Sequence, residues 1–365
     1  MINYICNECD RTYPHDTLEF KCACGGLFNL EPFDLDFKKD STDWSIFRYF
    51  GVLPLKGSDE VVTMGEGMTA LVPYDSKRPN WLLKMDYMMP TLSFKDRGAA
   101  VLVTLAKHLG VKKVIQDSSG NAGTAIAAYA ARAGIPCEIF VPAKTSPKKI
   151  QQIKAHGAKV VLVQGSREDT AKAAYEAASD NDAFYASHVY NPYFYQGTKT
   201  FGYEVFEQLQ DEMPEFFVLP VGNGTLVLGV YYALCELHTA ELIGHMPKII
   251  AIQSEYCAPI HYAFHNSSVP YSSSGKDTLA EGIAIADPKR GNQIMEAIRK
   301  TGGDVHLAPE HKILEAKKQL ADRGFFVETT TAATFAGFFD YIEKHPELEN
   351  DRFVLPLCGA GLKSE

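Results

Sequence analysis

Residues 111–141, VKKVIQDSSGNAGTAIAAYAARAGIPCEIFV, decide the fold class. An apolar run over residues 111–117 leads through a polar turn into an Ala-rich stretch, residues 121–132, and a second apolar run follows at 136–141. Short apolar runs bounded by turn residues indicate buried strands, and the Ala-rich stretch indicates a helix that ends before Gly134. The order strand, helix, strand predicts an α/β fold with a parallel sheet.

The same alternation extends in both directions along the chain. Residues 99–109 predict a helix that ends at Gly110, and Ser146 with Pro147 predicts the start of another. Further strands are predicted at 160–163, 216–220, 249–253 and 353–357, and further helices at 225–238, 311–322 and 331–344. Polar residues 265–277 predict a loop, and residues 30–60 predict an irregular linker.

Composition excludes several classes of protein. The 365 residues carry a net charge of -9, and their Lys and Arg side chains form no basic stripe, so we expect no nucleic-acid partner. The sequence contains no apolar run of about 18 residues, so we expect no membrane span. Its start, MINYICNECDR, lacks the apolar core of a secretory signal, and we therefore expect a soluble, cytoplasmic protein.

The cysteines are distributed unevenly. Four of the eight fall within the first 24 residues, and the others stand singly in apolar surroundings. In a reducing compartment the first group suggests metal binding, whereas the scattered group suggests buried core positions.

The segment PTLSFKDRG, residues 90–98, places Lys95 between Phe94 and Asp96 at the start of an apolar helix. A lysine there is partly desolvated, which lowers its pKa and makes the neutral amine available for imine formation and for proton abstraction at a substrate Cα. A solvated lysine paired with Asp96 is the alternative interpretation.

Two turns that join a strand to a helix are candidate anion sites. The serine turn, residues 118–121, offers backbone N–H groups and the positive end of a helix dipole to a carboxylate. The glycine turn, residues 222–225, lets a phosphate approach the backbone closely, and Thr225 adds a hydroxyl group. An ordinary N-cap and an ordinary strand-to-helix connection are the respective alternatives.

The order and spacing of these motifs resemble the pyridoxal phosphate (PLP) enzymes of the tryptophan synthase β-like group, called fold type II, and within it threonine synthase. The resemblance extends from about residue 60 almost to the end of the chain, and it rests on residues 63–69, 93–97, 118–121, 221–225 and 358–363. It implies two parallel or mixed sheet domains with the cofactor between them. The implied limits are a Cys-rich knuckle at 1–30, a large domain at 31–98 and 202–365, and a small domain at 99–201.

The resemblance also implies a role for each motif residue. Lys95 would hold PLP as a Schiff base and transfer protons, with Phe94 packed beside it. The residues implied to contact the rest of the cofactor are Asn121 at the phenolic oxygen, Gly222, Asn223, Gly224 and Thr225 at the phosphate, and Cys358 at the pyridine nitrogen. The substrate carboxylate would be bound by Ser118, Ser119, Gly120 and Asn121.

The Cys358 position has a chemical consequence. An uncharged partner leaves the pyridine ring a weaker electron sink, which suits elimination reactions. The alternative is that Cys358 is a small buried residue at the end of the last strand.

Many members of the resembled family begin with a Cys-rich knuckle, and this chain fits that pattern. The thiolates of Cys6, Cys9, Cys22 and Cys24 suffice for a tetrahedral structural zinc site. The alternative is a metal-free remnant with reduced thiols. The family also implies a homodimer.

Two departures bear on the substrate. Phe194 stands where threonine synthases commonly carry an Arg for the substrate phosphate, and the segment around Glu281 is more similar to threonine and serine dehydratases. Arg97, Lys144, Lys148 and Lys199 are candidate replacements for the missing cation.

The leading hypothesis is a PLP-dependent lyase that converts O-phosphohomoserine, a small amino acid, to threonine and phosphate. The alternatives are a serine or threonine dehydratase, a diaminopropionate ammonia-lyase, or a cysteate synthase-like replacement enzyme. A non-catalytic PLP-binding paralogue is the minor alternative.

Overall fold

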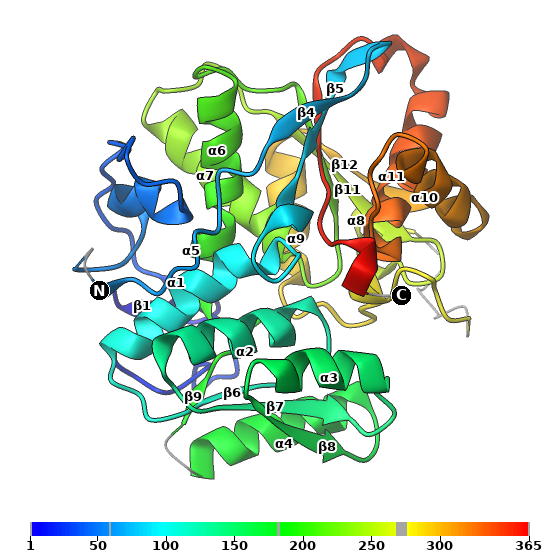
Figure 1. The fold of residues 1–365 in the computed structure, drawn as a ribbon. Coiled ribbons are helices and arrows are strands. Elements are labelled where there is room, and N and C mark those ends of the chain that lie inside the picture. Colours follow the sequence, from blue (N-terminus) through cyan, green and yellow to red (C-terminus); the bar gives the residue numbers. More distant parts are fainter. Residues whose placement is uncertain (1, 58–59, 181–182, 268–275, 364–365) are drawn as a thin grey trace. The chain divides into compact units, whose positions relative to one another are not determined.

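A computed structural model describes residues 2–57, 60–180, 183–267 and 276–363 (Figure 1). The chain forms two compact units. The first unit is Met1–Met68 with Lys95–Thr198, and the second is Thr69–Phe94 with Lys199–Glu365. These two units have other boundaries than the domains predicted from the sequence, and the predicted domain limits stay a prediction.

The main sheet of the first unit has four parallel strands in the order β8-β7-β6-β9. These strands are β6 (Val114–Gln116), β7 (Cys137–Pro142), β8 (Lys159–Val163) and β9 (Phe184–Tyr185). The helices of this unit are α1 (Lys95–His108), α2 (Asn121–Ala133), α3 (Pro147–Ala155), α4 (Arg167–Asp180) and α5 (Pro192–Thr198). The alternation of strand and helix predicted around residues 111–141 is therefore confirmed.

The N-terminal part of the first unit forms a separate antiparallel sheet in the order β2-β1-β3. Its strands are β1 (Tyr4–Cys6), β2 (Thr12–Tyr13) and β3 (Phe28–Leu30). The predicted linker contains a 3-10 helix, Ile46–Val52, whose apolar side chains Ile46, Phe47, Tyr49 and Val52 are buried. The linker is thus packed against the protein along this stretch.

The second unit contains a six-stranded sheet in the order β12-β11-β10-β13-β5-β4. The strands are β4 (Leu71–Asp75), β5 (Arg78–Lys84), β10 (Phe216–Pro220), β11 (Lys248–Ser254), β12 (Asp304–Ala308) and β13 (Phe353–Pro356). The helices are α6 (Thr200–Gln208), α7 (Thr225–Thr239), α8 (Pro259–Phe264), α9 (Gly291–Lys300), α10 (Ile313–Ala321) and α11 (Thr329–Lys344). Neighbouring strands are parallel except β4 and β5, which are antiparallel.

The core of the second unit explains its parallel strands. Every residue of β10 and of β13 is buried, as expected where both faces of a parallel sheet are covered. Trp81 of β5 packs against Phe338 of α11 with ring centroids 4.7 Å apart, and Phe216 stacks on Phe353 at 4.7 Å.

Two predicted elements have a bound that differs from the structure by at least three residues. Helix α1 begins at Lys95 rather than at residue 99, and β6 spans only Val114–Gln116 of the predicted 111–117. The predicted loop at 265–277 lies mostly outside the described residues. Within the described ranges, no helix has the length and apolar composition needed to cross a membrane.

Candidate active site

Lys95 is the first residue of α1 and is partly buried. Its Nζ lies 5.8 Å from the centroid of the Phe194 ring, which belongs to α5 and is fully buried. A Cβ atom on Gly98 would lie 2.4 Å from Cε1 of Phe194, so only glycine lets that ring lie against the first turn of α1. The structure therefore places the partly buried Lys95 beside an apolar ring.

His188, which the sequence motifs did not indicate as a site residue, lies near Phe194 and Lys95 in the first unit. The rings of His188 and Phe194 are 5.9 Å apart, and His188 Nδ1 lies 3.4 Å from Nε2 of Gln116. Burial first, and then the positive charge of Lys95, hold the pKa of His188 well below its usual range. Burial therefore favours the neutral form of this imidazole.

The serine turn connects β6 to α2. Gly120 is the N-cap of α2 with extended backbone (φ -100°, ψ -153°), and within the described chain no side chain caps this helix. Ser118 is buried, and its Oγ accepts a hydrogen bond from the N–H of Gly120 at 3.3 Å. A Cβ on Gly123 would lie 1.8 Å from the carbonyl oxygen of Ser118, so α2 packs directly on the turn. A helix N-terminus built this way suits a carboxylate.

Residues 63–69 form the first motif of the predicted family. They contact helix α2 through the side chain of Glu66. The fully buried carboxylate of Glu66 accepts hydrogen bonds from the hydroxyl of Tyr129 at 2.8 Å and from the N–H of Met64 at 2.9 Å. Burial raises the pKa of Glu66 to about 7. Glu66 thus ties the motif to the helix that the serine turn begins.

The glycine turn connects β10 to α7 in the second unit. Gly224 is the N-cap in the left-handed conformation (φ 73°, ψ 15°), and no described side chain caps α7. A Cβ on Gly224 would lie 2.3 Å from Cδ1 of Ile294, and one on Gly222 would lie 3.0 Å from Cα of Ile283. These glycines form a cradle that a Cβ would fill, and Thr225 begins α7 as a buried residue. The turn has the backbone shape and donors for a phosphate.

Glu281 belongs to a short 3-10 helix, Glu281–Ile283, that lies next to the glycine turn through Ile283 and Gly222. Glu281 itself is exposed. The preceding residues are held by the carboxylate of Glu310, which accepts hydrogen bonds from the hydroxyls of Thr278 and Ser254, each at 2.9 Å. The segment is therefore a fixed wall of the cradle that the glycine turn forms.

Cys358 follows β13 and is 1% exposed. Its carbonyl oxygen accepts a hydrogen bond from the N–H of Phe94 at 3.0 Å. Phe94 is buried and directly precedes Lys95 in the chain. The backbone just after the last strand thus fixes the residue before the lysine.

The candidate replacements for a phosphate-binding cation have different surroundings. Lys199 is fully buried and pairs with Oε1 of Glu236 at 2.8 Å, and desolvation lowers its pKa. Arg97 is also fully buried, whereas Lys144 and Lys148 are exposed. Lys199 is therefore engaged within the second unit.

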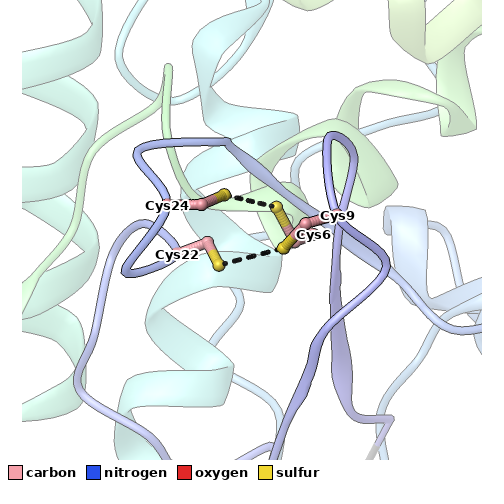
Figure 2. Close-up of side chains that lie close together, drawn as sticks. All are labelled: Cys6, Cys9, Cys22 and Cys24. Atoms are coloured by element: carbon pink, nitrogen blue, oxygen red, sulfur yellow. Dashed lines mark hydrogen bonds between the residues drawn. The ribbon is translucent and has the colours of Figure 1, made fainter.

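The four N-terminal cysteines come together, and Figure 2 shows their thiols pointing toward one another. All four sulfur atoms lie within 4.8 Å of one another, with Cys6–Cys24 at 3.5 Å and Cys9–Cys22 at 3.6 Å. Tetrahedral zinc with bonds of about 2.3 Å separates its sulfur ligands by roughly 3.8 Å, so this cluster fits such an ion.

Backbone donors support the same cluster. The N–H of Glu8 donates to Sγ of Cys6 and the N–H of Gly26 to Sγ of Cys24, each at 3.4 Å. The N–H of Cys24 and the hydroxyl of Tyr13 lower the pKa of the Cys22 thiol to about 6. Each of the eight cysteines, all within the described chain, is a free thiol, so these four remain able to bind a metal.

Comparison with known proteins identifies the relatives of this chain. Residues 62–359 match the family model described as pyridoxal-phosphate dependent enzyme. The threonine synthase of Methanocaldococcus jannaschii is 31% identical over 98% of this chain and 92% of that protein. The threonine synthase of Methanosarcina acetivorans is 34% identical over 92% of this chain and 86% of that protein.

Solved structures match the fold. Threonine deaminase isoform 2 from Solanum lycopersicum superimposes with a TM-score of 0.69 at 25% identity, covering 90% of this chain and 89% of that one. Maize serine racemase gives a TM-score of 0.68 at 19% identity, covering 80% of this chain and 88% of that one, and supports the fold alone.

Proposed function

Because this chain belongs to the pyridoxal-phosphate dependent enzyme family and is a PLP-dependent lyase of the threonine synthase kind, we propose that it converts O-phosphohomoserine to threonine and phosphate. The observation that carries this proposal is the similarity to the two threonine synthases named above, which covers 98% and 92% of this chain and 92% and 86% of those proteins.

PLP, when bound, supplies an electron sink for negative charge that develops at the substrate Cα. In our proposal Lys95 bonds the cofactor, and its amine removes and returns the Cα proton. The buried ring of Phe194, whose centroid lies 5.8 Å from the amine, would remove part of the contact between the lysine and water. Exclusion of water favours the neutral amine that proton removal requires.

The two turns would hold the two anionic groups. The serine turn, with Ser118, Ser119 and Gly120, would bind the substrate carboxylate at the start of α2. The glycine turn would bind the cofactor phosphate through Gly222, Asn223, Gly224 and Thr225. We further propose that Asn121 contacts the phenolic oxygen, that Phe94 packs beside Lys95, and that the Cys358 thiol faces the pyridine nitrogen.

A second candidate function is favoured by Phe194. A buried apolar ring beside Lys95 offers no charge-assisted hydrogen bond to a dianionic leaving group. This favours a substrate without phosphate, such as serine, threonine or diaminopropionate, with elimination to an oxoacid and ammonia. Replacement of the kind catalysed by a cysteate synthase is a variant of that function.

The deciding experiment gives the purified PLP-loaded enzyme O-phosphohomoserine, serine, threonine and diaminopropionate in parallel. Release of phosphate with formation of threonine supports the leading proposal. Formation of pyruvate or oxobutyrate without phosphate release contradicts it and establishes the second candidate. If every substrate is inert and Lys95→Ala leaves the PLP absorbance unchanged, the chain is a non-catalytic PLP-binding protein.

Further proposals follow from family membership. The chain would act as a cytoplasmic homodimer on a small amino acid, with one structural zinc in the cysteine knuckle and the cofactor held by a large and a small domain. Light scattering of the purified protein tests the dimer, and metal analysis tests the zinc.

A further inference from the structure

We propose that the metal-loaded knuckle, described over residues 2–30, fixes the arrangement of Lys95 and the serine turn in the first unit, so that zinc binding and PLP binding strengthen each other. This inference rests on the proposed roles of Lys95 and the serine turn. No knuckle residue would touch cofactor or substrate, and the knuckle would act through two aromatic anchors.

The first anchor joins the start of the chain to α5. The hydroxyl of Tyr193 donates to the carbonyl oxygen of Ile2 and accepts from its N–H, each at 3.2 Å. The ring of Tyr4 lies edge-on to Tyr193, with centroids 5.9 Å apart. Tyr193 directly precedes Phe194, the residue whose ring lies beside Lys95. Strand β1 of the knuckle therefore positions the helix that shields the lysine.

The second anchor joins the knuckle to the sheet. Phe20 inserts among Tyr175, Tyr185 and Tyr190, with ring centroids at 5.4, 5.2 and 5.4 Å. It packs against the apolar core that contains Tyr185 and Ile115. Tyr185 of β9 is the register partner of Ile115 in β6. Strand β6 leads directly into the serine turn. Phe20 therefore supports that turn through its contact with Tyr185 and the pairing of β9 with β6.

Each anchor stands two residues before a cysteine of the cluster. Tyr4 precedes Cys6, and Phe20 precedes Cys22. A metal ion that binds both cysteines therefore cross-links the two anchor segments. Because a metal site rarely exists in an unordered segment, the energy of metal binding is the energy that orders it. Removing the metal frees the loop that carries Phe20.

Thermodynamic linkage gives this proposal a reciprocal test. If the loaded knuckle raises the affinity for PLP by some factor, PLP must raise the affinity for zinc by the same factor. We expect a factor of about five to ten, at the low end of measured couplings between sites.

The experiment measures zinc affinity of the full-length protein by competition with a colorimetric chelator, once with PLP bound and once after its removal. The variants are Phe20→Ala, which removes the second anchor, and Tyr193→Phe, which removes only the hydroxyl bonds to Ile2. Trp44→Ala is the matched control, because this aromatic side chain of the first unit is 70% exposed. Hydrogen exchange of residues 114–121 and 189–198 is followed in the same samples.

We expect PLP to tighten zinc binding about five- to tenfold in the wild-type and Trp44→Ala proteins, and not at all in Phe20→Ala. Tyr193→Phe should keep its fold and lose part of the effect, which covers the case that Phe20→Ala does not fold. Exchange should rise in both segments when zinc is removed. Equal zinc affinity with and without PLP in the wild type, an undiminished effect in both anchor variants, or no zinc binding at all overturns the inference.

Failure of the proposed function would look different. If Lys95 does not bond PLP, the PLP absorbance of Lys95→Ala is the same as that of the wild type, whatever the zinc affinity. If Lys95→Ala loses the PLP absorbance but zinc affinity does not depend on PLP, only the coupling between zinc and PLP is contradicted, and the proposed role of Lys95 stands.

Discussion

The serine turn in the first unit and the glycine turn in the second each lead from a parallel strand into a helix that no described side chain caps. They differ in what surrounds the backbone. The glycine turn is walled by the apolar residues Ile283 and Ile294, and Gly224 adopts a left-handed conformation. The serine turn keeps extended backbone at Gly120, is partly exposed, and carries hydroxyl groups.

This difference matches two kinds of anion. Uncapped backbone N–H donors held in a tight, buried turn suit a phosphate that stays bound through many reaction cycles. A partly open turn with hydroxyl donors suits a carboxylate that enters and leaves in each cycle. We therefore expect substitutions in the serine turn to change substrate binding most, and substitutions in the glycine turn to change cofactor binding most.

Gly123→Ala should have the largest effect, and it should break the serine turn alone. Its Cβ would lie 1.8 Å from the backbone oxygen of Ser118, which cannot move without separating α2 from the turn. We expect the free energy of unfolding to fall by about 3 kcal/mol and kcat/KM to fall about a hundredfold. Gly244→Ala is the control, because its Cβ would meet no atom within 4 Å. An active Gly123→Ala enzyme with unchanged KM would contradict this account of the turn.

The second-largest effect should be on the free energy of unfolding, when Glu66 of the first unit loses its proton. Its pKa is about 7 in the folded protein against an ordinary value of 4.5, so between these values only the folded state retains the proton. The contribution of Glu66 to the free energy of unfolding therefore falls as pH rises from about 4.5 to 7, by roughly 3 kcal/mol in total, and is constant above that.

Denaturant unfolding of the wild type and of Glu66→Gln, from pH 4.5 to 8, measures this effect. The variant has no proton to lose, so its stability relative to wild type should rise across that interval. Because Glu66 bonds to Tyr129 of α2, KM should follow the same pH dependence more than PLP affinity does. Parallel stability curves for the two proteins would refute the prediction.

Gly224→Ala should break the glycine turn alone. An alanine in the left-handed conformation costs about 1–2 kcal/mol, and its Cβ would displace Ile294. PLP affinity should fall about tenfold, since 1.4 kcal/mol corresponds to a factor of ten, with little change in KM at saturating PLP. Adding Ile294→Ala removes the colliding atoms and should restore part of the affinity. A change in KM without a change in PLP affinity would reverse our assignment.

The smallest effects should come from single hydroxyl groups. Thr225→Val should weaken PLP binding about fivefold and leave KM unchanged, whereas Ser119→Ala should raise KM by a similar factor and leave PLP binding unchanged. Fluorescence titration with PLP and steady-state kinetics at saturating PLP measure the two quantities separately. If both variants shift both quantities equally, the two turns do not have separate ligands.

Strong periodicity made much of this fold predictable. The Ala-rich stretch before Gly134 is α2, and Ser146 with Pro147 does precede α3. Both turns were also visible in the sequence, because glycine and serine clusters interrupt apolar runs. The family that these motifs indicated is confirmed, while the roles of the individual site residues stay predictions.

Elements without periodicity could not be predicted. All seven residues of α5 are buried, so this helix shows no polar face in the sequence, and β9 has only two residues. The placement of Phe194 against Gly98 depends on the packing of α5 on α1, which joins positions almost a hundred residues apart. The sequence likewise gave no indication that Glu66 is fully buried or that His188 lies near Lys95.

The knuckle shows the same limit. The cysteine spacing predicted that Cys6, Cys9, Cys22 and Cys24 would come together, and they do. The contacts of Phe20 with three tyrosines arise only in the folded first unit. A single aromatic residue in a polar loop carries no pattern that would reveal such an anchor.

The most direct test of the central claim is to identify the residue that bonds the cofactor. The PLP-loaded protein is treated with borohydride, digested, and analysed by mass spectrometry for the pyridoxyl-modified lysine. We predict stoichiometric modification of Lys95, and no modification in Lys95→Ala. Modification of a different lysine, or none in a protein that retains its PLP absorbance, would contradict the account.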